Sequence, residues 1–109
     1  MKDMVNEAKE ILYEIIRKIP ENKRRGLVIY IYESLDDEIF YEYVGVVSEI
    51  NKTFGNSLAY CIDSVSFEDI KSALEQIRVN DESFDANCRV FYGIHAIYKT
   101  PCIKIRWKC

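Results

Sequence analysis

The chain has 109 residues, of which 49% are hydrophobic and 30% charged, and a formal net charge of −3, which suits one globular domain with a single core. Its four glycines and two prolines exclude a low-complexity protein. The sequence lacks both an apolar run of about 18 residues and the pattern of a secretory signal peptide, so we expect no transmembrane helix. We therefore expect a single cytoplasmic domain over residues 1–109.

The first predicted element is an amphipathic helix over residues 4–19. Asp3 is a suitable N-cap, and Pro20 should end the helix. One apolar stripe at three- and four-residue spacing should pack on a sheet; it contains Met4, Val5, Ala8, Ile11, Leu12, Ile15, Ile16 and Ile19. The basic run 23–25 then favours a solvated turn over a phosphate-binding patch, because three cations are few for a nucleic-acid footprint.

Residues 27–33 and 39–47 are both rich in β-branched and aromatic side chains, which favour strands. The acidic break at 34–38 suits a hairpin loop. We expect two adjacent antiparallel strands, the first more deeply buried because it is apolar on both faces.

The middle of the chain contains one weak strand and one well-marked helix. Residues 48–56 are ambiguous, and 58–62 fit a short third strand. Ser66, followed three residues later by Asp69, resembles a capping box at the start of a helix over 67–78. Residues 80–87 are polar and typical of a loop.

The last part of the chain predicts two more strands. Residues 90–98 are largely apolar on both sides, which indicates a central strand. After the Thr100–Pro101 turn, residues 102–108 alternate between basic and apolar positions, which indicates an edge strand with one basic face in water. The expected fold class is α+β: a mainly antiparallel sheet of four to five strands, two helices on one face, and the order α-β-β-(β)-α-β-β.

Cysteines 61, 88, 102 and 109 have no Cys-x-x-Cys spacing, and we expect reduced thiols, no disulfide, no bound metal and no cofactor. Cys109 should be exposed. His95, the only histidine, favours a position in the core or on the sheet surface. A thiol-dependent enzyme that uses a cysteine with His95 stays open as an alternative, although no nucleophile motif surrounds these residues. The chain also lacks a glycine-rich phosphate loop, so we expect that it is not an enzyme.

Charge is unevenly distributed along the chain. Residues 1–26 carry a net charge of +2, residues 27–87 carry −10, and residues 88–109 carry +5 with no acidic residue. Tyrosines accompany the central acidic residues, and such rings are enriched at protein interfaces. An acidic surface of this kind can steer a basic partner. The expected partner-binding residues are Glu33, Asp36, Asp37, Glu38, Tyr41, Glu42, Tyr43, Asp81, Glu82 and Asp85.

The start of the chain resembles a known family. A helix ends in Ile19-Pro20-Glu21, and two strands rich in tyrosine follow at 27–32 and 40–43. This pattern is similar to the first part of YezG-type immunity proteins, which neutralise LXG-type polymorphic toxins. It covers about the first 47 residues, and Lys23-Arg24-Arg25 stand where that family has a tryptophan. The resemblance implies a cytoplasmic antitoxin that binds a cognate toxin domain, possibly a basic nuclease, as a stoichiometric inhibitor without catalysis.

A third alternative is a nucleic-acid-associated domain that uses Lys104, Arg106 and Lys108 with Trp107. The strand alternation places Trp107 on the opposite face from these cations, whereas a stacking platform needs both on one side. We therefore rank this alternative last and expect neither nucleic acid nor membrane as a partner.

Overall fold

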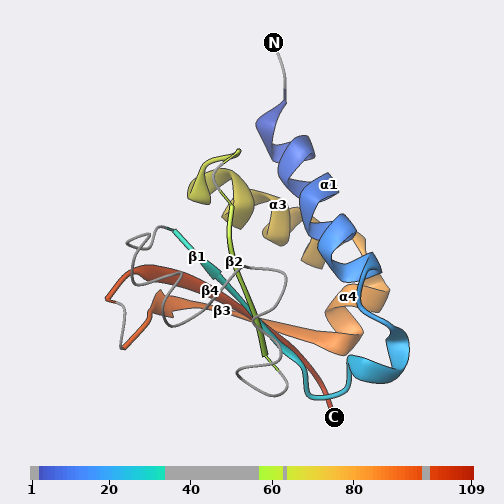
Figure 1. Cartoon of the computed structure of the whole chain (residues 1–109). Coiled ribbons are helices and arrows are strands. Elements are labelled where there is room, and N and C mark those ends of the chain that lie inside the picture. Colours follow the sequence, from blue (N-terminus) through green and yellow to red (C-terminus); the bar gives the residue numbers. More distant parts are fainter. Residues whose placement is uncertain (1–2, 34–56, 63, 97–98) are drawn as a thin grey trace.

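In a computed structural model, the described residues are 3–33, 57–62, 64–96 and 99–109. They form an α+β structure, as predicted (Figure 1). The elements in chain order are α1 (Met4–Arg17), the 3-10 helix η1 (Glu21–Lys23), β1 (Val28–Tyr32), β2 (Ser57–Cys61), α3 (Phe67–Asn80), α4 (Glu82–Asn87), β3 (Cys88–Ile94) and β4 (Pro101–Trp107). None of the described helices has the length and apolarity needed to cross a membrane.

Helix α1 begins as predicted, with the Asp3 carboxylate accepting hydrogen bonds from the backbone N–H groups of Val5 (3.0 Å) and Asn6 (3.3 Å). It ends at Arg17, two residues before the predicted end. Its apolar stripe packs against the core. Ala8 and Leu12 are its buried members, and the helix lies beside α3.

The basic run after α1 contains one structural residue. The Arg24 guanidinium donates from Nε to the carbonyl of Ile19 (3.0 Å) and from Nη2 to the carbonyl of Ile16 (3.1 Å). Carbonyls after the last turn of a helix lack intrahelical partners, and Arg24 satisfies that of Ile19; the Ile16 carbonyl also accepts from the N–H of Ile19 (3.1 Å). Gly26 then turns the chain into β1 with a φ of +71°, a conformation that favours glycine.

The sheet is mixed, which corrects the prediction of a mainly antiparallel one. Its strand order is β2-β1-β4-β3. β1 pairs in parallel with β2 and antiparallel with β4, and β3 pairs antiparallel with β4. The predicted hairpin partner at 39–47 lies outside the described residues. The strands that pair with the two edges of β1 are β2 and β4.

The predicted positions of the last two strands are reversed in the sheet. β3 was expected to be central and is an edge strand, whereas β4 was expected at the edge and lies between β1 and β3. The reason is that side-chain alternation reports which face of a strand is covered and does not report how many neighbours the strand has. The basic side of β4 faces away from the described helices, and Arg106 on it is exposed.

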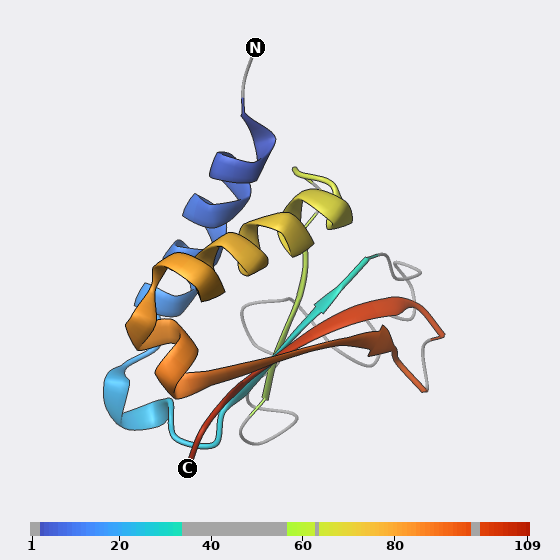
Figure 2. The same cartoon turned by 180° about the vertical axis from the view of Figure 1, so that it is seen from behind.

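Helices α1 and α3 lie on one face of the sheet (Figures 1 and 2). The core between these layers is aliphatic; its most buried sheet residues are Ile29, Ile31, Ile103 and Ile105, each at most 1% exposed. Helix α3 starts as predicted, with Ser66 Oγ accepting from the N–H of Asp69 (3.1 Å). No described helix lies on the opposite face of the sheet.

Residues 80–87 were predicted to be a loop and instead contain helix α4. Asp81 caps this short helix by accepting a hydrogen bond from the N–H of Phe84 (3.0 Å), and Phe84 is buried in the core. A helix is predicted from apolar residues that recur every three to four positions, and a single buried aromatic residue among polar ones does not form such a pattern.

Candidate functional site

The structure does not bring the predicted acidic surface together in the part of the chain that it describes. Six of its ten residues lie outside the described ranges: Asp36, Asp37, Glu38, Tyr41, Glu42 and Tyr43. Glu33 follows β1 and donates its N–H to the carbonyl of Pro101 (2.9 Å). Asp81, Glu82 and Asp85 belong to α4 or its cap, at the other end of the sheet, where β3 begins opposite the end of β4. The two acidic groups are therefore separated by the length of a strand.

Asp81 is a structural residue. In addition to capping α4, it accepts a hydrogen bond from the Tyr13 hydroxyl at 2.8 Å, which joins α1 to α4. The N–H of Phe84 and the Tyr13 hydroxyl lower the pKa of the Asp81 carboxyl. Burial and this bond to a carboxylate raise the pKa of Tyr13 to about 12. By contrast, Glu82 and Asp85 are exposed and remain candidates for partner contact.

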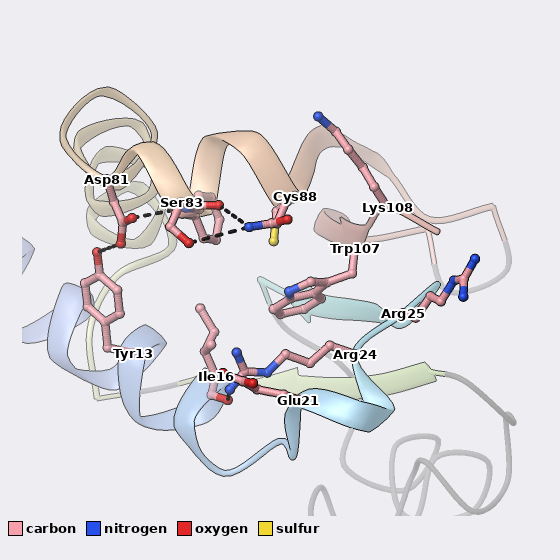
Figure 3. Close-up of a pocket in the computed structure, with 12 residues that line it drawn as sticks. Tyr13, Ile16, Glu21, Arg24, Arg25, Asp81, Ser83, Cys88, Trp107 and Lys108 are labelled. Atoms are coloured by element: carbon pink, nitrogen blue, oxygen red, sulfur yellow. Dashed lines mark hydrogen bonds between the residues drawn. The ribbon is translucent and has the colours of Figure 1, made fainter.

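A pocket of about 440 Å³ lies beside this bond (Figure 3). Its lining combines cations, carboxylates and the indole of Trp107; the labelled residues are Tyr13, Ile16, Glu21, Arg24, Arg25, Asp81, Ser83, Cys88, Trp107 and Lys108. Burial raises the pKa of the Cys88 thiol to about 12, although Arg24 and Lys108 oppose this shift. The thiol is thus protonated at neutral pH and is a weak nucleophile.

His95 lies on the sheet surface, one of the two positions expected for it. Its ring meets those of Tyr30 and Tyr32 edge to face, at centroid distances of 6.1 and 5.4 Å. Burial lowers the pKa of the imidazole. His95 and Cys102 both line a hollow of about 330 Å³. Burial raises the pKa of the Cys102 thiol to about 11. Protonation of this thiol disfavours the cysteine–histidine enzyme alternative.

No disulfide joins any of the four cysteines, and Cys109 is exposed as expected. Cys88 and Cys102 are buried. Among the described residues, no group of three or more His, Cys, Asp or Glu side chains could hold a metal ion.

One edge of β3 has no partner strand among the described residues and is here called its free edge. At the two ends of the β3–β4 hairpin, His95 donates its N–H to the carbonyl of Thr100, and Lys108 donates to the carbonyl of Asn87, both at 2.9 Å. Hydrogen-bonded positions alternate along an antiparallel ladder. The odd-numbered residues of β3 therefore bond to β4, and the backbone groups of its even-numbered residues point away from the sheet.

Large apolar side chains accompany that free edge. Phe91, Tyr92 and Ile94 are 48%, 41% and 72% exposed, and no other strand of the described chain pairs with this side of β3. An exposed edge with apolar side chains is a template for pairing with another chain. The apolar pattern of residues 90–98 was visible in the sequence, but it was interpreted as burial.

The face of the sheet that points away from α1 and α3 carries a cluster of cations and rings, here called the basic face. It comprises Tyr30, Arg89, Phe91, Lys104, Arg106 and Lys108, whose alternation with the buried positions places them away from the helices. Trp107 is on the other face, as predicted, and is buried. Tyr30 and Phe91, the aromatic neighbours of these cations, come from β1 and β3, so the sequence of β4 alone, with Trp107 on its other face, does not predict them.

Comparisons of the chain with protein-family models, with curated proteins and with solved structures returned no match.

Proposed function

We propose that this chain is a small cytoplasmic binding protein, the immunity partner of a bacterial toxin domain, and that it acts by forming a complex and not by catalysis. The observation that carries the proposal is the free edge of β3 with its exposed Phe91, Tyr92 and Ile94. A toxin segment in extended conformation can pair with the outward backbone groups of Tyr92 and Ile94, while its side chains cover the apolar ones. This interaction requires no active site in the inhibitor.

The uneven charge supports a basic toxin domain as the partner. Residues 27–87 carry a net charge of −10, and Glu82 and Asp85 are exposed on α4, immediately before β3. Carboxylates next to a docking edge attract a basic partner before contact and orient its approach. The six acidic and tyrosine positions within 36–43 belong to the same proposal.

The test is co-expression with the product of the adjacent gene. A toxic neighbour whose growth inhibition is relieved by this chain, and which copurifies with it, is the expected result. The edge variant Ile94→Lys should weaken the complex by at least tenfold, since a charge would replace a desolvated apolar contact. Val79→Lys is the matched control, because Val79 is 78% exposed but lies on α3.

Three results would contradict parts of the proposal. A non-toxic neighbour, or the absence of a complex, would remove the immunity function. Equal binding by Ile94→Lys and Val79→Lys would leave the inhibitor and remove β3 as its docking edge. Glu82→Ser with Asp85→Ser should slow association and flatten its salt dependence, because exposed charges act over about 8–10 Å. An unchanged association rate would remove the role of α4.

A further inference from the structure

We propose that the basic face binds single-stranded nucleic acid, with bases stacked on Phe91 and Tyr30 and phosphates held by the surrounding cations. The site is on the face of the sheet that points away from α1 and α3, and it goes beyond the inhibitor function, which uses the edge of β3 and α4. Four cations, two rings and a hollow lie together on this face.

The first observation is a pair of like charges. Arg89 and Arg106 are directly opposite each other in the β3–β4 ladder, and both are exposed. Like charges at opposed positions destabilise a sheet. Among the described residues, no carboxylate forms an ion pair with either guanidinium or with Lys104 or Lys108. Such a pair is well suited to an anion that both guanidiniums can contact, and phosphate matches their geometry.

The second observation is the arrangement of rings around Lys104. This residue pairs with Tyr30 of β1 on one side and with Phe91 of β3 on the other. Its Nζ is 6.0 Å from the centre of the Tyr30 ring and 5.9 Å from that of Phe91. The strands that carry the two rings are two strand spacings apart, about 10 Å, and Lys104 lies on the strand between them. Proteins that bind single-stranded nucleic acid combine aromatic rings and cations on one surface, because the bases stack on the rings and the negatively charged phosphates contact the cations.

The third observation is a hollow of about 230 Å³ where β3 and β4 meet the C-terminal residues. Arg89, Arg106 and Lys108 line it together with the Phe91 ring. A phosphate in this hollow would contact the arginines while the attached base reaches Phe91, which is 48% exposed. Residues 88–109 contain five basic residues and no acidic one, so no acidic side chain from this segment opposes such an anion.

The arrangement favours single strands over duplexes. In a duplex the bases are paired and stacked on one another, so they cannot stack on Phe91, and only the phosphates would remain in contact. It also favours nucleic acid over an acidic protein segment, because carboxylates would contact the arginines without stacking a base on either ring.

The test measures fluorescence anisotropy of labelled twelve-nucleotide oligothymidine and oligouridine, with a DNA duplex of equal length as comparison. We expect micromolar binding of a single strand at 50 mM salt and weaker binding of the duplex. Comparison of the two single strands distinguishes DNA from RNA. Arg106→Ala should weaken binding and reduce the salt slope by about 0.7, the value for one lost phosphate contact on a single strand. Arg17→Ala, an exposed arginine on α1, is the control of equal charge change.

Phe91→Ala should weaken single-strand binding about 5- to 100-fold, the range for loss of one stacked base. Phe91→Leu preserves apolar volume and removes the ring, so it should show a similar loss without a folding defect. Ile94→Ala on the same strand but the other face should bind normally. Absence of binding up to 100 µM at 50 mM salt overturns the proposal. Duplex binding as tight as single-strand binding, or normal binding by Phe91→Leu, also overturns it and leaves a surface that attracts polyanions, acidic proteins included.

Discussion

The neighbouring strands β3 and β4 have opposite sequence patterns and opposite positions in the sheet. β4 alternates strictly, and its apolar residues Ile103 and Ile105 are at most 1% exposed. β3 is apolar on both faces, yet Phe91 and Ile94 are 48% and 72% exposed. An alternating strand can therefore be central when the described helices cover only one face of the sheet, and a largely apolar strand can lie at the edge of the described sheet with part of its apolar surface exposed.

The largest expected difference between the two strands is in stability. Ile103→Ala on β4 should lower the free energy of unfolding by about 2–5 kcal/mol, because it leaves a cavity in the core. Ile94→Ala on β3 should lower it by less than about 0.5 kcal/mol, since that side chain is exposed. Urea denaturation of the two variants measures both values. Similar losses would show that the edge of β3 is covered in solution.

A smaller effect is expected at the start of β3, where α4 leads into the strand. Asp81→Ala removes the cap of α4 and the bond from Tyr13, and it should lower stability by about 1–2 kcal/mol. Asp85→Ala on the same helix is the control and should stay within about 0.5 kcal/mol. If the two variants are equally stable, the bond between Tyr13 and Asp81 does not hold α4.

The Asp81 interaction should also depend on pH. The folded state lowers the pKa of the Asp81 carboxyl, so its contribution is complete above the ordinary aspartate pKa of about 3.9 and is lost as the pH falls through the lowered value. The difference in stability between wild type and Asp81→Ala should therefore shrink in acid. A difference that stays constant down to the acid-unfolding region would contradict this assignment.

The smallest expected effect is on the bond that fixes the middle of β3 to α3. The Tyr92 hydroxyl donates to Glu75 Oε1 at 2.7 Å, which lowers the pKa of Glu75, and burial together with this bond raises the pKa of Tyr92. Tyr92→Phe should lower stability by at most about 1 kcal/mol, because the pair is exposed to solvent.

The pKa of Glu75 is lowered and that of Tyr92 is raised, and these directions set the pH range in which the bond stabilises the fold. The contribution of Glu75 is present above its ordinary pKa and is lost in acid, whereas that of Tyr92 is present below its ordinary pKa and is lost in alkali. Stability curves of wild type and Tyr92→Phe, measured from acidic to alkaline pH, should converge at both ends. Divergence at either end would contradict the assigned bond.

The candidate sites were less predictable than the elements. Glu82 and Asp85 could be recognised as exposed acidic residues, but the hydrogen bonds of Asp81 could not, because Tyr13 is 68 residues away in the chain. The basic face was half visible, as the alternation of Lys104 and Arg106 shows, but its rings come from two other strands. Likewise, the exposure of the β3 edge could not be predicted from its sequence, because apolar residues occur both in protein cores and at interfaces.

The sequence by itself determined the local structure: the caps Asp3 and Ser66, the stripe that contains Leu12, and the inward and outward positions of β4. These features depend on hydrogen bonds within a few residues or on a period of side-chain burial, and both are written in neighbouring positions. Only the tertiary structure decided that β1 pairs in parallel with β2, that β4 is central and that β3 is at the edge. Pairing partners are chosen among segments far apart in the chain, and side-chain alternation specifies a face without specifying a neighbour.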